Sequence, residues 1–302
     1  MRNYKGNGGV LNSDVIILGT SGMLGQEVTR IFTEEGLLHS GYSRQPGRSR
    51  YFDFNEQTAE EVAEILSVSP GAYVINCIGW IPQRGTGDPI VDQANAWKLN
   101  VNLPIVLEQL AERMSVRVLQ ITTDCVFDGS NGGYLESDLA NAEEVYGKSK
   151  IAGEKCQPSA MQIRCSIIGQ DRNSKAGLFS WYKSQPKNGL VTGYANHFWN
   201  GVTTTALAKL FLGIIRENEF VPGLQHWIPL DSVSKFELLS EFRKVLGGDA
   251  AKVLEGQGSN RVDRTLSTDN PLVSDRYWIL AGYGKTPSIA ELVRELDEPE
   301  QV

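Results

Sequence analysis

Hydrophobic positions along the first half of the chain alternate between two spacings. Short continuous apolar runs are typical of strands buried on both faces of a parallel sheet, and the first covers residues 14–18. Between these runs, apolar residues recur at helical spacing, and Thr58…Glu61 and Ser234…Glu237 form capping-box starts. The pattern predicts strands at 14–18, 37–43, 72–78, 116–122, 161–165 and 224–228, and helices at 23–35, 58–68, two within 89–114, 141–157, 205–216, 234–246 and 288–296.

The alternation of strand and helix predicts an α/β fold with a doubly wound parallel sheet. The rhythm breaks after Ile168, and no internal repeat is visible. We therefore expect a large domain from residues 14–168 and about 200–232, interleaved with a smaller lobe from about 169–199 and 233–302. Residues 1–13 are polar and glycine-rich and are expected to form a flexible tail.

Composition and charge bear on the binding partners and on the cellular location of the protein. The 302 residues are 41% apolar and carry a net charge of −7 without a basic stripe, so we expect no nucleic-acid partner. The apolar runs are far shorter than the ~20 residues that span a bilayer, which predicts no membrane-spanning helix. The first 13 residues lack the features of a secretory signal, so a cytoplasmic location is expected.

Cysteine and histidine are few. The four cysteines form no CxxC pair, and three lie in apolar runs, which predicts reduced, buried thiols. The three histidines show no metal-ligand spacing, so no metal site is expected.

A glycine-rich turn follows the first predicted strand. Gly19, Gly22 and Gly25 stand where the strand gives way to a helix, in a GxxGxxG pattern. Glycines there allow a tight turn, close approach of a pyrophosphate, and packing of the helix on the sheet. The turn predicts dinucleotide binding.

The end of the second predicted strand bears on which dinucleotide binds. Ser43 and Arg44 stand there in place of an acidic residue, and Arg48 and Arg50 follow. Arginine pairs with a 2′-phosphate where an acidic residue would accept from a ribose hydroxyl, so NADP(H) is favoured over NAD(H). Asp53-Phe54 is a candidate contact for the adenine, although an aspartate capping a turn is an alternative.

A tyrosine and a lysine occur at helical spacing further along. Tyr146 and Lys150 are four residues apart in a predicted helix and so lie on one face. At about 5 Å and an effective dielectric of about 20, the ammonium would favour the phenolate by roughly 3 kcal/mol, which lowers the tyrosine pKa by about two units. Such a tyrosine could exchange a proton near neutral pH, and Lys150 could also hold a ribose.

A threonine at the end of an earlier strand completes the set. Thr122 and Thr123 point to opposite faces of that strand, so only one can serve. The glycine turn, this threonine and the YxxxK pair, in this order, resemble an extended short-chain dehydrogenase/reductase. Segments TTDCVFDG (122–129), YLESD (134–138) and YGKSKIAGE (146–154) are similar to STDYVFDG, YxExD and YGxSKxxGE of the dTDP-4-dehydrorhamnose reductase family.

This resemblance implies a Rossmann domain that binds NADPH and a lobe that binds a nucleotide sugar. The activity that it implies is reduction of the C4 ketone of a nucleotide-activated 6-deoxyhexose, in the making of surface polysaccharide or glycoconjugate. By position it implies Thr123, Tyr146 and Lys150 as the catalytic residues. The residues expected to contact the cofactor are Gly19, Ser21, Gly22, Met23, Leu24, Gly25, Ser43, Arg44, Asp53, Phe54, Asn76, Cys77, Ile78, Gly79, Asn100, Tyr146 and Lys150.

The substrate wall departs from the family pattern. Cys125 stands where the family has tyrosine, and Trp80 follows an altered cofactor segment, so the sugar stays open. Expected substrate contacts are Trp80, Asp124, Cys125, Val126 and Arg264; for Arg264, diphosphate binding and pairing with Asp263 or Asp269 are equal alternatives. An epimerase of the superfamily or a non-catalytic NADP(H)-binding sensor or subunit are the rival functions, and Cys125 in place of glutamate disfavours a dehydratase. The oligomeric state is open, with a homodimer as one option.

Overall fold

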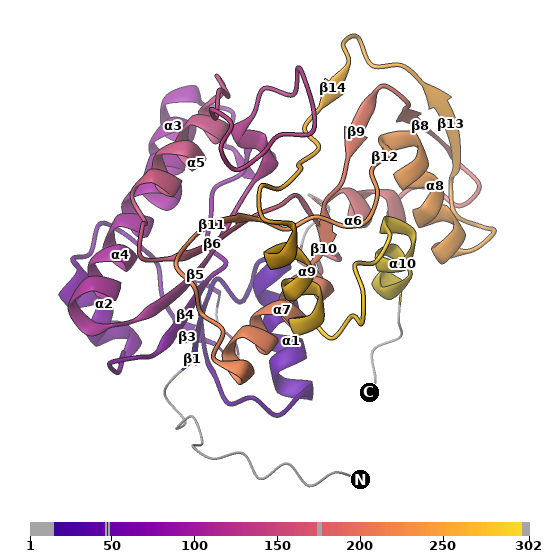
Figure 1. Cartoon of the computed structure of the whole chain (residues 1–302). Helices are drawn as coiled ribbons and strands as arrows, with labels where there is room; N and C mark the ends of the chain where they lie inside the picture. The colour runs from indigo at the N-terminus through magenta and orange to yellow at the C-terminus, as the bar shows by residue number, and fades with distance from the viewer. Residues whose placement is uncertain (1–14, 46, 48, 174–176, 298–302) are drawn as a thin grey trace, which may run out of the picture.

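The computed structural model describes residues 15–45, 47, 49–173 and 177–297 (Figure 1). The tail expected at 1–13 and the loop residue Arg48 lie outside these described residues. A seven-stranded sheet, parallel throughout, occupies one side of the molecule, which confirms the predicted doubly wound α/β fold. Its strands, in spatial order, are β11 (Gly223–His226), β6 (Met161–Arg164), β5 (Arg117–Thr122), β4 (Tyr73–Asn76), β1 (Val15–Leu18), β2 (Ser40–Ser43) and β3 (Arg50–Tyr51).

The strand order reverses between β1 and β4, and that reversal determines where a ligand can enter. Leu18 at the end of β1 is in register with Asn76 at the end of β4, and Asn76 is in register with Gln120 in β5. The segments that leave these strands therefore emerge side by side at one edge of the sheet. In open α/β sheets, ligands bind in the crevice at this point.

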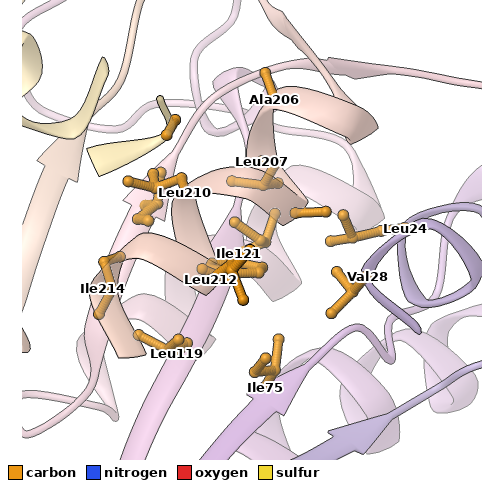
Figure 2. Packing of buried hydrophobic residues seen from close by; sticks show 14 of the residues in the cluster. Leu24, Val28, Ile75, Leu119, Ile121, Ala206, Leu207, Leu210, Leu212 and Ile214 are labelled. Atoms are coloured by element: carbon orange, nitrogen blue, oxygen red, sulfur yellow. The ribbon is translucent and has the colours of Figure 1, made fainter. Parts of the chain in front are cut away.

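Helices cover both faces of the large sheet. On one face α1 (Met23–Glu34), α7 (Thr204–Glu217) and α9 (Pro271–Leu280) share an apolar core with the sheet, and Figure 2 shows Val28 of α1 and Leu207 of α7 packing towards Ile121 of β5. On the other face α2 (Ala59–Leu66) and α4 (Leu103–Met114) form a second core. The thick core on each face holds the carboxyl ends of the strands rigidly in place.

Two further helices lie beside the second core. A continuous run of α3 (Pro89–Trp97) and a π-helical turn, η2 (Lys98–Asn102), leads into α4, and α5 (Val145–Lys155) packs against η2. Short 3-10 turns are η1 (Pro82–Arg84), η3 (Asp124–Val126) and η4 (Glu295–Asp297). The helix α5 matters most for function because it carries the predicted tyrosine and lysine.

A smaller apolar core lies in the C-terminal part of the chain, at the right of Figure 1. Two strand groups and three helices build this region: β8 (Leu190–Tyr194) with β13 (Lys252–Gly256), β9 (His197–Trp199) with β12 (Val233–Ser234) and β14 (Val262–Asp263), and α6 (Leu178–Lys183), α8 (Lys235–Leu246) and α10 (Ile289–Arg294). The short pair β7 (Ile167–Ile168) and β10 (Val202–Thr203) lies next to it in the chain. The predicted domain boundaries stay a prediction, and α9 departs from them by packing on the core of the large sheet.

Two other expectations change. The two predicted capping boxes, at Thr58 and Ser234, are confirmed. The helices differ from the prediction in two places: α9 was not expected, and α5 begins at Val145 rather than near residue 141. All four cysteines are free, yet only Cys165 is fully buried; Cys77, Cys125 and Cys156 are half-buried. Among the described residues, no helix has the length and apolar content needed to cross a membrane.

Candidate active site

The glycine turn after β1 is built almost wholly from backbone. Gly19 has a φ of +82° and donates its N–H to Tyr42 O at 2.8 Å, which ties the turn to β2. A Cβ on Gly25 would lie 2.1 Å from Gly19 O, so only glycine lets α1 pack this closely on the turn. Gly22 caps α1 without a side-chain hydrogen bond, which leaves N–H groups at the helix start open to an anion.

An open cleft with about 520 Å³ of empty space lies at the ends of β1, β2 and β4. Ten of the predicted cofactor contacts line it, and the structure thus brings them together: Gly19, Ser21, Gly22, Ser43, Arg44, Asp53, Phe54, Cys77, Ile78 and Gly79. Phe52, Arg84 and Leu99 also line the cleft and were not predicted. Met23 is half-buried, and the side chain of Leu24 belongs to the apolar core, so only its backbone faces the turn.

Arginines at the two rims of the cleft differ in their partners. Arg44 is 69% exposed and only loosely paired with Asp53, at 3.9 Å. Arg84 instead makes a 3.0 Å bond to the buried carboxylate of Asp171. Arg44 is therefore the one of these two that is readily available to a ligand.

Two buried asparagines serve the protein's own loops. Asn76 donates to Gln120 Oε1 at 2.8 Å and accepts from the Ile78 N–H at 3.0 Å, which shapes the loop after β4. Asn100 holds both backbone groups of Trp80 and donates to Ser149 Oγ at 2.9 Å. Both side chains are engaged within the protein, which favours a positioning role for them over direct contact with a cofactor.

The start of α5 is held by Glu144, which accepts the N–H groups of Tyr146 and Gly147. One turn later, Lys150 directs Nζ towards Ile121 O at 3.4 Å, and a Cβ built on Gly79 would lie 3.6 Å from it. The ammonium therefore sits against a wall of the cleft. Burial lowers the pKa of Lys150 to about 8, although Glu154 and Cys125 raise it.

The expected acidification of Tyr146 is wrong for the protein as the structure describes it. Burial raises the pKa of the Tyr146 hydroxyl, and the neighbouring Cys125, Asp124 and Glu144 raise it further. A hydrogen bond with the Thr123 side chain acts the other way and is the smaller effect. Tyr146 is thus a neutral phenol in the free protein, and donation of its proton requires a partner that stabilises the phenolate.

The segment after β5 brings three polar side chains together. Thr123 Oγ1 accepts the Cys125 N–H at 3.1 Å and donates to Asp124 Oδ1, also at 3.1 Å. Asp124 is 8% exposed, and its burial raises the pKa of the carboxyl. Burial also raises the pKa of Cys125, to about 12, so that its thiol stays protonated. Thr122, by contrast, donates to Glu154, which leaves Thr123 as the threonine that meets Tyr146.

The remaining predicted substrate contacts have mixed outcomes. Arg264 donates from Nε to Phe127 O at 2.8 Å and pairs with neither Asp263 nor Asp269, so that alternative is wrong. Val126 is fully buried in an apolar cluster, and its side chain does not line the site. The indole of Trp80 is 8% exposed, and its Nε1 lacks a partner in the described part of the chain. Sequence reasoning missed Lys235, whose charge acts on the carboxyl of Asp124.

A buried network of polar side chains contacts α5 through Glu154. Arg164 pairs with Glu154 of α5 at 2.5 Å and donates to His226 Nε2 at 2.9 Å. His226 donates from Nδ1 to Ser267 O at 2.6 Å, and Glu136 accepts the His226 N–H at 2.7 Å. The YxExD glutamate therefore links the segment after Arg264 to the helix that carries Tyr146.

The sequence and the fold of the chain are similar to those of known proteins. The chain is 26% identical over 257 residues to a probable low-salt glycan biosynthesis reductase, Agl14, of Haloferax volcanii, covering 78% of this chain and 81% of that protein. It is 25% identical over 236 residues to methionine adenosyltransferase 2 subunit beta of Xenopus tropicalis, covering 74% and 69%. A dTDP-4-dehydrorhamnose reductase of Bacillus anthracis, solved in complex with NADP, superposes with a TM-score of 0.71 at 18% identity, over 93% of this chain and 97% of that one.

A model of one protein family matches most of the chain. The RmlD substrate binding domain matches residues 13–255, which include the glycine turn, β5 and α5. The chain belongs to the RmlD substrate binding domain family.

Proposed function

We propose that this protein is an NADPH-dependent reductase of a nucleotide-activated 4-dehydro-6-deoxyhexose. The observation that carries the proposal is the hydrogen bond between Tyr146 and Thr123, one helical turn from Lys150, whose Nζ lies near Gly79 in the lining of the cleft. The similarity to Agl14 and the fold of the NADP-bound reductase from Bacillus anthracis support it. The expected pathway is the making of surface polysaccharide or glycoconjugate.

The residues of the cleft fit a dinucleotide. The backbone at Gly19 and Gly22 would receive the pyrophosphate, and Gly25 lets α1 pack closely enough on the turn to keep that backbone in place. Exposed Arg44 would pair with a 2′-phosphate, which favours NADPH over NADH. When bound, the reduced nicotinamide supplies a hydride for the sugar carbonyl.

Three polar side chains donate the proton, orient the ketone and bind the ribose. Tyr146 donates its proton to the ketone oxygen, and Thr123 holds that oxygen by a hydrogen bond. Lys150 binds a ribose hydroxyl and, in its protonated form, favours the phenolate that proton transfer leaves behind. Asn100 keeps the loop of Gly79 against α5, so that these groups stay aligned.

Turnover distinguishes this function from its main rival. Purified protein should oxidise NADPH when a nucleotide 4-keto-6-deoxyhexose is added, and Tyr146→Phe should lower the rate by about 100-fold or more. NADPH binding should persist in the variant, because the phenyl ring keeps the packing. Tight NADPH binding without turnover of dTDP-, UDP-, GDP- or CDP-linked keto sugars would contradict the proposal.

The second candidate is a dinucleotide-binding subunit of a larger enzyme. The similarity to methionine adenosyltransferase 2 subunit beta favours it. The presence of Tyr146, Lys150 and Thr123 together favours an enzyme, since a binding subunit does not need a proton donor.

A further inference from the structure

A small cavity lies behind one wall of the cofactor cleft, between α5 and the sheet. It has about 250 Å³ of empty space, and Ile78 and Leu99 line both the cavity and the cleft. The rest of its lining comes from η2, α4, α5, the end of β5, the segment after α5 and β6. The cavity therefore adjoins the helix that carries Tyr146.

Lys150 and Glu154 are the two charged residues in the described lining of this cavity. They are four residues apart on α5, so they lie on one face of the helix. Consecutive residues of β5 contact them, because Lys150 Nζ points to Ile121 O at 3.4 Å and Glu154 accepts a hydrogen bond from Thr122 Oγ1. The other polar side chains of the lining are neutral: Asn100, Gln120, Thr122, Gln157 and Gln162.

The carboxylate of Glu154 is fixed by a second contact. Arg164 of β6 donates from Nη2 to Oε2 at 2.5 Å and from Nε to Oε1 at 3.1 Å. The side chain of Glu154 is 8% exposed and that of Arg164 is 4% exposed, and Arg164 does not belong to the described lining of the cavity. Two hydrogen bonds from a planar guanidinium fix the direction of a carboxylate, so Glu154 has little freedom to move relative to Lys150.

A buried lysine stays charged more readily when a carboxylate is near it. Burial lowers the pKa of Lys150 to about 8, and Glu154 raises it by more than Cys125 does. The Cys125 thiol is protonated near neutral pH, because burial raises its pKa to about 12, and Tyr146 is a neutral phenol. Of these neighbours of Lys150, Glu154 therefore supplies the negative charge.

We propose that Glu154 is a positioning residue that acts across this cavity to keep the Lys150 ammonium charged beside Tyr146. The proposal deepens the proposed function and rests on it, since a charged Lys150 favours the phenolate that proton donation leaves on Tyr146. Arg164 holds the Glu154 carboxylate in place for this task.

Titration of the Lys150 side chain by NMR tests this role without turnover or cofactor. The full chain would be labelled with lysine that carries ¹³C at Cε, and the signal lost in Lys150→Met identifies the residue. The wild-type signal should titrate with a pKa of about 8. In Glu154→Gln, which keeps the size of the side chain but removes its charge, the pKa of Lys150 should fall to about 7.

The pH dependence of turnover should shift in the same direction. Turnover by the wild type should decline as the pH rises through the pKa of Lys150, because the ammonium is lost. In Glu154→Gln this decline should begin about one pH unit lower, while KM for the keto sugar changes little.

Arg164→Gln is the matched control, because it breaks the same buried ion pair and retains the carboxylate in the cavity lining. It should leave the pKa of Lys150 at about 8. If Glu154 only held α5 in place, loss of either partner would let water reach Lys150 and raise its pKa towards 10.5 in both variants.

A pKa of Lys150 that stays at about 8 or rises in folded Glu154→Gln would overturn the proposal. Thermal unfolding shows whether this variant folds. If it does not, the double variant Glu154→Gln, Arg164→Gln replaces it with the same expected fall, since it leaves neither member of the buried pair charged. Failure of the proposed function is separate, because it would appear as absent NADPH oxidation by the wild type, whatever the NMR titration shows.

Discussion

The region that lines the cleft and the region proposed to face the substrate are built in opposite ways. The cofactor wall is a backbone turn of three glycines within seven residues, and a Cβ added at Gly19 or Gly25 would lie 3.0 Å or less from neighbouring atoms. The second region, called the substrate wall because the proposed function brings the substrate there, carries charged side chains from three distant segments: Asp124, Lys235 and Arg264. Sterics therefore fix the first wall, and electrostatics define the second. A single methyl group should break the first, whereas the second should lose affinity in smaller steps.

The largest effect is expected at the glycine turn. In Gly25→Ala, the new Cβ would lie 2.1 Å from Gly19 O, so the turn must move. NADPH affinity, measured by fluorescence titration, should fall by about 100-fold or more, because the pyrophosphate contacts depend on that backbone. Gly248→Ala is the control, since its Cβ meets nothing within 4 Å. Unchanged affinity in Gly25→Ala would show that the turn does not bind the dinucleotide.

Lys150 Nζ lies near Gly79 of the cleft, and removal of this lysine should lower the rate of turnover and change how the stability of the protein depends on pH. Turnover by Lys150→Met should fall by about 100-fold. Burial lowers the pKa of Lys150 to about 8 from 10.5, so the folded state binds this proton less tightly than the unfolded chain does. The free energy of unfolding of the wild type should therefore rise relative to that of Lys150→Met as pH increases from about 8 to 10. Denaturant unfolding at several pH values would show a flat difference if the amine were solvated.

A smaller effect is expected for Arg44. Its exposed guanidinium works in water, where ion pairs are weak and screened by salt. Arg44→Ala should weaken NADPH about 10-fold while changing NADH little, as competition titrations would measure. Arg50→Ala is the control, because Arg50 is bonded to Tyr42 Oη at 3.1 Å. An equal loss of affinity for NADPH and NADH would show that Arg44 does not bind the 2′-phosphate.

The smallest effect concerns the support of the substrate wall. Burial and Arg164 lower the pKa of His226 below 6.5, so the folded protein binds this proton less tightly than the unfolded chain. Stability is full above about pH 6.5 and declines as the pH falls below it. Between pH 7 and 5.5 the wild type should lose about 1 kcal/mol more than His226→Asn in urea unfolding. The same slope in both proteins would mean that His226 titrates freely.

The cofactor wall was largely predictable from sequence, and the reason is local. Gly19, Gly22 and Gly25 follow a recognisable strand and precede an amphipathic helix, and the Tyr146–Lys150 pair lies on one helix. Residues that are close in sequence stay close in the folded protein, so such local patterns also predict the large sheet and the crevice at its edge. The expected pKa of Tyr146 was wrong because burial and the neighbouring Cys125, Asp124 and Glu144 raise it, and the spacing of residues in the sequence does not show how deeply a side chain is buried.

The substrate wall was less predictable because its contacts are long-range. Lys235 is the first residue of a capped helix, where a lysine is ordinarily solvated. No nearby residue in the sequence indicates that its charge acts on Asp124. The helix α9 was missed for a related reason. It buries Tyr277 and Trp278 while Leu272 and Ile279 are exposed, so it shows no single apolar face.

Isotope transfer tests the central claim most directly. NADPH carrying deuterium at the reactive nicotinamide carbon would be mixed with a nucleotide-activated 4-keto-6-deoxyhexose, and the product analysed by mass spectrometry and NMR. The account predicts one deuterium at C4 of the product with wild-type protein, and about 100-fold less labelled product in the same time with Tyr146→Phe, which still binds NADPH. A wild-type protein that binds NADPH yet transfers no deuterium to any nucleotide keto sugar would contradict it.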